Sequence, residues 1–519
     1  MNIKQQTPAL IRAMLEPGFY SPPVKSCELI ETHISWVILT GSFVYKIKKP
    51  VDFGFLDFSS LEKRKFYCEE ELRLNQRLAP EIYLEVITIH GTEESPVFND
   101  DGRIVEYAVK MMQFPQHTEL DQLLKQGKLT HNIIDSISEL IADFHQQIDV
   151  ADNDSEFGEP GTVLQPVKEN FNQIRERVCD NETLGKLLHI EQWSDKTFNK
   201  LKSVLKERQQ NGFIRECHGD LHLRNLAWYQ NTPLAFDCLE FNAQFRWIDV
   251  MSEVAFLIMD LKDHLQPELA SRFLNRYLEV TGDYAGCSVL NFYQVYRAMV
   301  RAKVEAIRLQ QTADIANKDN SEITGFTNYL KLAENFTRKK ELFILITRGV
   351  SGSGKSTITG PLSEKLGAIR IRSDIERKRL FSVNMDTHHH TDIAQGIYSA
   401  QATEKTYLKL LELAEIILQS GFPVIIDATF SDYKQRQLFS QLAKKYHSRY
   451  LILELQTENK ILKQRVTNRK NDVSDANLDV LTNQLNNWQP LEETEIPYTF
   501  SVDTGKTPDI GKLIQQLEL

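Results

Sequence analysis

Three polar residues in the first half of the sequence are of the types that phosphate chemistry requires. The loop CHGDLHLRNL places Asp220 and Asn225 five positions apart, and Asp237 follows twelve residues after Asn225 in the run LAFDCLEF. Phosphoryl transfer needs a carboxylate that orients the acceptor hydroxyl and accepts its proton, together with oxygen ligands for Mg²⁺. Asp220 and Asn225 supply these groups from one loop, and Asp237 can supply a second metal carboxylate. The alternative is that Asp220 and His218 only hydrogen-bond a turn.

A second stretch with a phosphate-binding pattern lies more than a hundred residues later. RGVSGSGKST fits G-x-x-x-x-G-K-[ST], preceded by the apolar run FILIT and followed by a helical pattern. Glycines allow backbone N–H groups to wrap phosphates, the lysine reaches the β- and γ-phosphates, and the serine hydroxyl binds Mg²⁺. We therefore expect an ATP·Mg²⁺ site. Its residues are Gly349, Ser351, Gly352, Ser353, Gly354, Lys355, Ser356 and Thr357.

Two aspartates and two arginines complete this second set. Asp374 ends one predicted strand with Arg377 one turn further on, and Asp427 ends the buried run VIID. Ligands bind at the carboxyl ends of parallel strands, so both aspartates should face the phosphates. Arg465 and Arg469 are four positions apart on one helix face, from which they can close over a transferring phosphate as a lid. For this pair alone, a solvated helix face is the simpler interpretation.

Residues 341–519 resemble the P-loop kinases related to polynucleotide kinase, gluconate kinase and the zeta-toxin family. The resemblance implies that Asp374 deprotonates an acceptor hydroxyl, that Arg377 clamps a substrate phosphate, and that Asp427 helps to position Mg²⁺. It leaves the acceptor open. A basic cluster beside Asp374 favours a phosphorylated or otherwise anionic acceptor, with a polynucleotide end as one option. The cluster consists of Arg370, Arg372, Arg377, Lys378 and Arg379.

The pattern HGDxHxxN, followed by an apolar strand that ends in Asp, resembles the aminoglycoside phosphotransferase family. This family is a branch of the protein-kinase-like fold, and the resemblance covers about residues 20–310. It implies that Asp220 is the catalytic base and that Asn225 and Asp237 hold Mg²⁺. Two features depart from the family pattern: LTGSFVYK holds a single glycine, and DCLEF stands where a DFE-type run is usual.

The same resemblance points to an upstream lysine and glutamate. Lys46, in the strand-like run FVYKIKK, would bind the phosphates of the nucleotide. Glu71, in the helical pattern CEEELRLN, would pair with this lysine, and Glu70 is the alternative because the helix register is open.

The elements that must position these residues divide the chain into two parts. Strand-like runs alternate with one helical pattern over the first hundred residues, and the pattern is mostly helical from 121 to 309. This predicts a bilobal α+β, protein-kinase-like domain at 1–310. The polar segment 311–325 indicates a linker, which we extend to 340. Strands then alternate with helices from 341 to 519, which predicts an α/β P-loop domain with a parallel sheet.

Composition excludes several classes of protein. With 41% hydrophobic and 25% charged residues, no apolar run approaches the roughly 20 residues of a membrane helix. The N-terminus has no secretory pattern and the six cysteines lack CxxC spacing, so we expect a cytoplasmic protein with reduced thiols. Residues 341–519 carry 22 Lys and Arg against 22 Asp and Glu, so the net charge of −10 lies in the first 340 residues. Such an acidic region is a poor general nucleic-acid binder.

A run of three histidines, at 388–390, is the remaining candidate for a metal site. Three adjacent side chains cannot all face one ion on a helix or a strand, so a solvated loop is the simpler interpretation.

Together these patterns predict a fusion of two ATP-dependent phosphotransferase domains. The enzyme would use ATP and Mg²⁺ and transfer the γ-phosphate to hydroxyl acceptors, either small molecules or phosphorylated compounds, with no membrane partner. One alternative is a single active P-loop kinase regulated by a kinase-like domain that senses nucleotide. Another is an ATP-driven interaction or toxin–defence module without a small-molecule acceptor. The complete set of Asp220, Asn225 and Asp237 favours two active sites, while the acceptors and the oligomeric state stay open.

Overall fold

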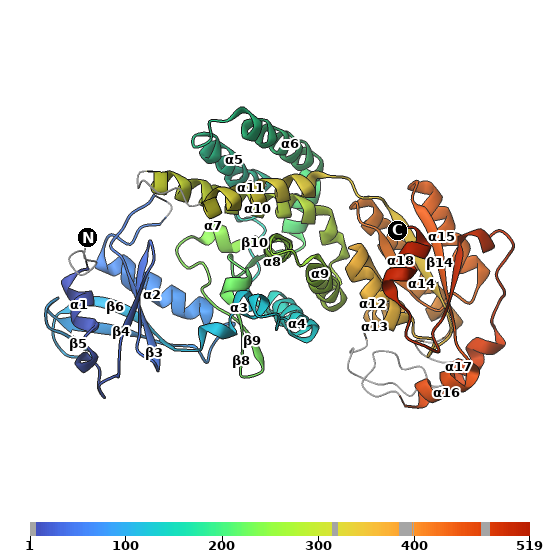
Figure 1. The fold of residues 1–519 in the computed structure, drawn as a ribbon, viewed down its shortest axis with the longest axis horizontal. Coiled ribbons are helices and arrows are strands. Elements are labelled where there is room, and N and C mark those ends of the chain that lie inside the picture. The colour runs from blue at the N-terminus through green and yellow to red at the C-terminus, as the bar shows by residue number, and fades with distance from the viewer. Residues whose placement is uncertain (1–6, 55, 314–319, 383–396, 398, 469–477) are drawn as a thin grey trace. The chain divides into compact units, whose positions relative to one another are not determined.

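The computed structural model describes residues 7–54, 56–313, 320–382, 397, 399–468 and 478–519, with the backbone alone at 311–313 and 320–324 (Figure 1). The chain divides into two compact units, residues 1–163 with 205–260 and residues 164–204 with 261–519. The domain boundaries expected from the sequence stay a prediction, because these units are defined by contacts and interleave chain segments.

A six-stranded antiparallel sheet forms much of the first unit, in the order β1-β2-β3-β6-β4-β5. Its strands are rich in Val, Ile, Tyr and Phe, which pack well on a pleated surface. β3 lies between β2 and β6, where Lys46 pairs in register with Val37 and Val109, so this lysine stands on an inner strand. The strands are β1 (Glu28–Glu31), β2 (Ser35–Leu39), β3 (Phe43–Lys48), β4 (Tyr83–Gly91), β5 (Pro96–Phe98) and β6 (Ile104–Met112).

Helix α2 (Leu61–Asn75) packs against this sheet. Ser60 caps the start of this helix, because its hydroxyl accepts a hydrogen bond from the Lys63 N–H at 3.2 Å and satisfies one of the free donors of the first turn. Cys68 of the helix is buried with Tyr83 and other residues of the sheet. The charged Glu71 is buried on the same helix, so it requires partners.

The rest of the first unit consists of helices and two strand pairs, β7 with β10 and β8 with β9, both antiparallel. Helices α5, α6 and α8 each begin in one unit and end in the other. The elements are α1 (Ala9–Met14), α3 (Leu120–Lys125), α4 (His131–Gln147), α5 (Pro160–Arg175), α6 (Asn181–Gln210), β7 (Ile214–Glu216), β8 (Leu226–Tyr229), β9 (Thr232–Ala235), α7 (Ala243–Arg246), β10 (Trp247–Asp249) and α8 (Val250–Asp263).

The second unit contains a five-stranded parallel sheet in the order β12-β13-β11-β14-β15. Its central strand β11, FILITR, is buried along its whole length, as a parallel strand covered on both faces should be. The strands are β11 (Phe343–Arg348), β12 (Ile369–Arg372), β13 (Val424–Asp427), β14 (Arg449–Gln456) and β15 (Thr499–Asp503). The helices that follow β11 are α12 (Lys355–Leu366), α13 (Ser373–Leu380), α14 (Ala400–Gln419), α15 (Tyr433–Lys445), α16 (Asn459–Thr467), α17 (Leu478–Asn486) and α18 (Ile510–Leu517).

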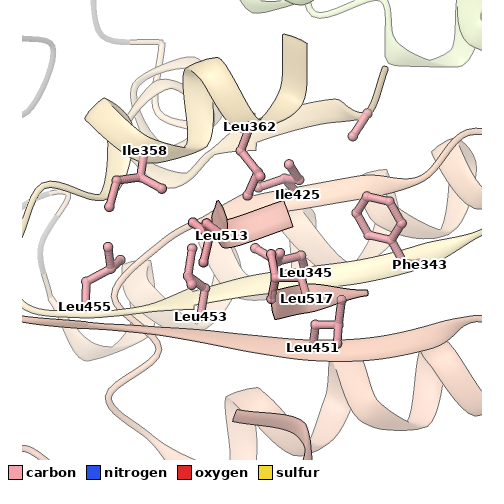
Figure 2. Packing of buried hydrophobic residues seen from close by; sticks show 11 residues of the cluster. Phe343, Leu345, Ile358, Leu362, Ile425, Leu451, Leu453, Leu455, Leu513 and Leu517 are labelled. Atoms are coloured by element: carbon pink, nitrogen blue, oxygen red, sulfur yellow. The ribbon is translucent and has the colours of Figure 1, made fainter. Parts of the chain in front are cut away.

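One face of this sheet packs against α12 and α18 (Figure 2). Leu513 and Leu517 lie four positions apart on α18 and reach the same apolar cluster as Ile358 and Leu362 of α12. Fully burying each such side chain contributes about 1.5–3 kcal/mol relative to leaving it exposed. This packing holds α12 in place, and its first residue, Lys355, belongs to the phosphate-binding pattern.

Helices α9 (Pro267–Thr281), α10 (Cys287–Ala313) and α11 (Asn320–Thr337) also belong to the second unit. The structure therefore differs from the linker expected over 311–340, most of which is helical. The cause is an apolar periodicity in NYLKLAENF that the polar residues before it obscured. The buried side chains of α11 follow helical spacing and are Phe326, Tyr329, Leu330, Ala333 and Phe336.

The antiparallel sheet with helices in the first unit and the parallel α/β sheet in the second confirm the predicted fold class. Within the part of the chain that the structure describes, none of the helices is both long and apolar enough to cross a membrane.

Candidate active sites

Strand β3 and helix α2 bring the predicted lysine and glutamate of the first site together. Lys46 Nζ lies 2.7 Å from Glu71 Oε1 and 2.6 Å from Asp237 Oδ1. The alternative glutamate, Glu70, instead accepts hydrogen bonds from the guanidinium of Arg73 at 2.8 Å. The helix register therefore pairs Lys46 with Glu71.

The electrostatics of this group keep Lys46 charged. Burial alone would lower the pKa of Lys46, but the carboxylates of Asp237 and Glu71 raise it well above its usual range. Burial likewise opposes ionisation of Glu71, yet Lys46 and a second lysine, Lys48, lower its pKa. A largely buried lysine cation and a buried glutamate anion therefore lie side by side, and the lysine also contacts Asp237.

The backbone at Asp237 has an unusual conformation. It follows β9 with a φ of 63°, in the left-handed region that few residues other than glycine adopt. Its N–H donates to Tyr83 Oη at 3.2 Å, and its side chain is half-exposed. Such outliers persist where the surroundings enforce them, and here the result is a carboxylate that reaches both Lys46 and solvent.

The loop after β7 brings Asp220 and Asn225 together. Asn225 Nδ2 donates to Asp220 Oδ2 and to the Asp220 main-chain oxygen, both at 3.0 Å. His222 Nε2 lies 3.3 Å from the same carboxylate oxygen. The Phe236 N–H donates to the Asn225 carbonyl at 3.0 Å, which connects this loop to the segment that carries Asp237.

The backbone of this loop is braced by two carboxylates of α8. Buried Glu253 accepts hydrogen bonds from Gly219 N at 2.6 Å, His218 N at 3.2 Å and His145 Nε2 at 2.8 Å. Asp260 accepts from Leu223 N at 2.9 Å. Burial alone would raise the pKa of Glu253, but the hydrogen bond and charge of His145 contribute to lowering it to about 2. Glu253 therefore holds the loop as an anion at neutral pH.

Two residues of this loop, His218 and Gly219, have structural roles. His218 Nε2 contacts the Phe236 carbonyl oxygen at 2.8 Å, and burial lowers the pKa of His218, so a neutral ring ties the loop to the next segment. Gly219 has a φ of 89°, and a Cβ there would lie 2.9 Å from the Phe245 carbonyl oxygen. Only glycine fits this position without a shift of backbone.

Two further charged residues lie in this site and were not predicted from the sequence, Lys48 and Glu240. Lys48 Nζ lies 2.7 Å from Glu71 Oε2 and also pairs with Glu240, and both side chains are buried. Residues two positions apart on a strand share a face, so the run FVYKIKK contained the signal for a second lysine beside Lys46. Glu240 gave no comparable signal, because its partner is distant in sequence.

In the second unit, the phosphate-binding pattern forms the loop between β11 and α12. Gly352 and Gly354 each have a φ of 85°, and a Cβ at Gly349 would collide with the Ser353 hydroxyl. Lys355 Nζ donates to the carbonyl oxygens of Gly349 at 3.0 Å and of Val350 at 3.1 Å, so the lysine folds back over its own loop. These features are those of a backbone cradle for phosphates.

The predicted aspartates of this site line the same cavity as the loop. A cavity of about 260 Å³ is lined by Lys355, Ser356, Asp374 and Asp427, among others. Asp427 ends β13 and accepts a hydrogen bond from Thr359 Oγ1 at 2.9 Å, while Asp374 lies in the first turn of α13. The carboxyl ends of β12 and β13 therefore place both carboxylates beside the phosphate loop.

The structure describes two of the arginines predicted for this site, Arg377 and Arg465. Arg377 lines the cavity, is buried, and donates to the Ile397 carbonyl at 2.7 Å and to Thr403 Oγ1 at 3.3 Å. Arg465 donates to the Gly352 carbonyl at 3.3 Å and to the Thr504 carbonyl at 2.7 Å. It lines a second cavity of about 320 Å³ beside the loop. Arg469 and the histidines at 388–390 lie outside the described residues.

The basic cluster expected beside Asp374 is largely neutralised. Arg370 pairs with Glu279 at 2.7 Å, and Arg372 lies 3.8 Å from the same carboxylate. Arg379 pairs with Glu376, also in α13. The sequence showed the cations but not the buried carboxylates that face these three, so Arg370, Arg372 and Arg379 no longer argue for an anionic acceptor.

Comparison with protein families identifies both parts of the chain. Residues 59–290 match the model of the phosphotransferase enzyme family, and residues 344–491 match a family described as an AAA domain. These matches confirm the two predicted resemblances, to a phosphotransferase of the kinase-like fold and to a P-loop kinase-like domain. The chain is accordingly an enzyme of the kinase class.

Curated relatives span nearly the whole chain. "Uncharacterized protein Rv2004c" of Mycobacterium tuberculosis (strain ATCC 25618 / H37Rv) is 30% identical over 451 residues, which cover 87% of this chain and 88% of the relative. "Uncharacterized protein Mb2027c" of Mycobacterium bovis matches with the same identity and coverage. Both parts of the chain therefore occur together in these relatives.

Solved structures match the chain over part of its length. The amicoumacin kinase hAmiN is 13% identical, with a TM-score of 0.40, over 64% of this chain and 94% of its own. A gluconokinase from Sinorhizobium meliloti 1021 is 18% identical, with a TM-score of 0.24, over 35% of this chain and 91% of its own. At these scores the likeness carries no conclusion about function.

Proposed function

We propose that this chain, which belongs to one family with the mycobacterial protein Rv2004c, transfers the γ-phosphate of ATP to hydroxyl acceptors at two separate sites. One site is the group around Lys46 and Asp220, and the other is the phosphate loop around Lys355. The observation that carries the proposal is the complete arrangement in the first unit, where Lys46 contacts both Glu71 and Asp237. A domain that only sensed nucleotide would not require the base, Asp220, as well.

In the first site, the base is Asp220. Its carboxylate is partly exposed and is oriented by Asn225 Nδ2 at 3.0 Å, so it can accept the proton of an acceptor hydroxyl as that oxygen attacks phosphorus. Lys46 supplies the positive charge that draws the phosphates of ATP toward this carboxylate. Glu71 keeps the lysine in place, because its own carboxylate is buried and fixed.

The residues of the first site also fit Mg²⁺. The carboxylate of Asp237 and the amide oxygen of Asn225 are oxygen ligands, which this hard cation prefers. Mg²⁺, when bound, would neutralise charge on the phosphates. The carboxylate of Asp237 is half-exposed, so it is accessible to a metal ion.

In the second site, the backbone N–H groups of the loop and Lys355 would hold the phosphates of a second ATP molecule. Ser356 and Asp427 provide the hydroxyl and carboxylate oxygens that suit Mg²⁺. Asp374 lines the same cavity and is the base that would take the acceptor proton. Arg377 would contact the transferring phosphate or a charged group of the acceptor, and Arg465 would contact the nucleotide from the neighbouring cavity.

The acceptor of the second site is, in this proposal, a small hydroxylated molecule. Neutral polar side chains such as Thr403, Asn483 and Asn487 line the cavity, and these groups hydrogen-bond hydroxyls. A polynucleotide end is the option that the neutralised basic cluster no longer supports. A cytoplasmic location also belongs to the proposal, since ATP must reach both sites.

The test is to incubate the full chain with a metabolite extract and ATP labelled in the γ-phosphate, and to identify labelled products by mass spectrometry. Asp220→Asn and Asp374→Asn should each remove a different set of products. If Asp220→Asn changes no product while Asp374→Asn removes all of them, the first unit senses nucleotide and the two-site proposal is wrong. Labelled oligonucleotides at low salt test the polynucleotide option directly.

A further inference from the structure

Helix α9 closes the edge of the parallel sheet in the second unit. β12 is an edge strand, since the sheet order begins with it. Asn275 of α9 accepts a hydrogen bond from Arg370 N at 2.7 Å and donates to the Ala368 carbonyl at 3.0 Å. The side chain of one buried asparagine thus satisfies two backbone groups that an uncovered edge would leave to water or to another strand.

One turn further along α9, Glu279 contacts two arginines of the same strand. Its side chain is buried, and Oε1 accepts from Arg370 at 2.7 Å while Oε2 lies 3.8 Å from Arg372. The Glu279 carbonyl oxygen also accepts a hydrogen bond from the guanidinium of Arg379, in α13, at 2.6 Å. Glu279 therefore contacts both the strand that leads into α13 and the helix itself.

The turn after α9 adds a third contact. Tyr284, in the 3-10 turn Tyr284–Gly286, donates from its hydroxyl to Glu376 Oε1 at 3.2 Å, and both side chains are buried. In Figure 1, α9 lies beside α12 and α13 in the second unit. Residues 275–284 therefore hold β12 and α13 at several points.

These contacts fall on one side of α13, and the cavity lies against another. Glu376 and Arg379 are three positions apart and share a helix face, as do Asp374 and Arg377. Positions 374 and 376 differ by about 200° around a helix of 3.6 residues per turn, so the two pairs point in nearly opposite directions. One face of α13 is anchored on α9, while the other presents the carboxylate and guanidinium that line the cavity.

We propose that helix α9 is a working part of the P-loop site and that Glu279 is the residue that positions α13, and with it Asp374, against the phosphate loop. The role of Asp374 as base rests on the function proposed above. The anchoring residues lie within 59–290, the segment that matches the phosphotransferase enzyme family, whereas the phosphate loop lies within 344–491. The second site is thus completed by a helix from outside its own family segment.

The physical reason is the burial of the charges. Removing the negative charge of Glu279 leaves the guanidinium of Arg370 without a counter-charge in a largely buried position. We expect the residues where β12 joins α13 to shift so that this charge becomes better solvated. A misplacement of about 1 Å at a reacting group lowers a rate by about 10²-fold. The nucleotide cradle is formed by the loop after β11, so its affinity for ATP should not depend on this corner.

The experiment compares Glu279→Gln with a matched control on the same helix, Glu268→Gln, in full-length protein that also carries Asp220→Asn. Glu268 forms an exposed ion pair with Lys365, which belongs to α12 rather than to α13. The first measurement is hydrogen exchange of residues 369–380. The second is release of labelled phosphate from ATP to water, and the third is ATP·Mg²⁺ affinity by calorimetry.

We expect Glu279→Gln to speed exchange in residues 369–380 by about tenfold or more, while β11 and β14 stay protected. Phosphate release should fall by about 10–10²-fold with ATP affinity unchanged, and Glu268→Gln should change none of these quantities. Tyr284→Phe, which removes one hydroxyl and keeps the ring, should loosen the same residues less.

The proposal is overturned if exchange in residues 369–380 stays as in the parent, or if the whole parallel sheet loosens equally. Should Glu279→Gln fail to fold, Tyr284→Phe decides by the same measure. Hydrogen exchange does not depend on catalysis. An unchanged ATP affinity in Lys355→Ala would therefore refute the proposed P-loop function but would leave the contact between α9 and α13 open to the same test.

Discussion

Replacement of Lys48 by methionine tests whether buried charges hold the first site together. Lys48 is fully buried and pairs with Glu71 and Glu240. In Lys48→Met, Glu71 keeps Lys46 as its partner, so the carboxylate that loses its counter-charge is Glu240. Removing one partner of a buried ion pair destabilises a protein by about 3–5 kcal/mol. For a domain of about 150–250 residues this corresponds to a fall in melting temperature of about 6–20 °C.

The assay is thermal and urea unfolding followed by circular dichroism, with hydrogen exchange of residues 43–48 and 61–75 to locate the loss. Burial already raises the pKa of Glu240, so it takes up a proton more readily than an ordinary glutamate, and the loss should shrink as pH falls. The double variant Lys48→Met/Glu240→Gln should recover most of the stability, because no unpaired charge is left. Lys65→Met, which removes an exposed pair with Glu69 and a contact with the Tyr107 ring 6.0 Å away, should cost under about 1 kcal/mol. If the double variant is no more stable than Lys48→Met, the buried charge is not the cause.

Three further predictions concern the two sites and the loop between β7 and β8. Asp220→Asn should lower phosphate transfer from the first site by about 10²–10⁴-fold with little change in ATP affinity, measured in a Lys355→Ala background; full transfer in that double variant contradicts the assignment. Lys355→Ala should remove one of two ATP-binding events seen by calorimetry of the full chain, and an unchanged isotherm argues against a P-loop site. Glu253, whose pKa is lowered to about 2, contributes stability that is present above its unfolded pKa of about 4.3 and is lost as pH falls toward 2, about 3 kcal/mol in all. Glu253→Gln should flatten this acid dependence of unfolding, and an unaltered curve excludes Glu253 as its source.

Much of the geometry of both candidate sites could be predicted, because many of their residues lie close together in the sequence. The P-loop spacing defines its own backbone geometry, and the loop HGDLHLRN carries Asp220 and Asn225 within a few residues of each other. Lys46 and Glu71 needed only a strand and a helix in adjacent positions, and the open choice between Glu70 and Glu71 was settled by which helix face packs on the sheet.

The parts that escaped prediction depend on partners from distant segments. Arg370 and Arg379 resembled a binding surface because nothing in the sequence indicates that Glu279, 91 and 100 residues earlier, contacts them. Glu240 pairs with Lys48 because the fold brings the loop after β9 next to strand β3, two segments that are distant in sequence. Helix α11 was missed for another reason, since its apolar stripe follows a polar stretch that favours a loop.

The asparagine that closes the edge of β12 has a consequence for how such a chain can evolve. A recombination event that separated the P-loop half at residue 340 would leave Arg370 N and the Ala368 carbonyl without Asn275. The released half would then present a bare strand edge, which other chains can extend into aggregates. Selection against that outcome would keep the two halves in one gene, whether or not their reactions are related. Any lineage that split them would first have to acquire a new cover for this strand.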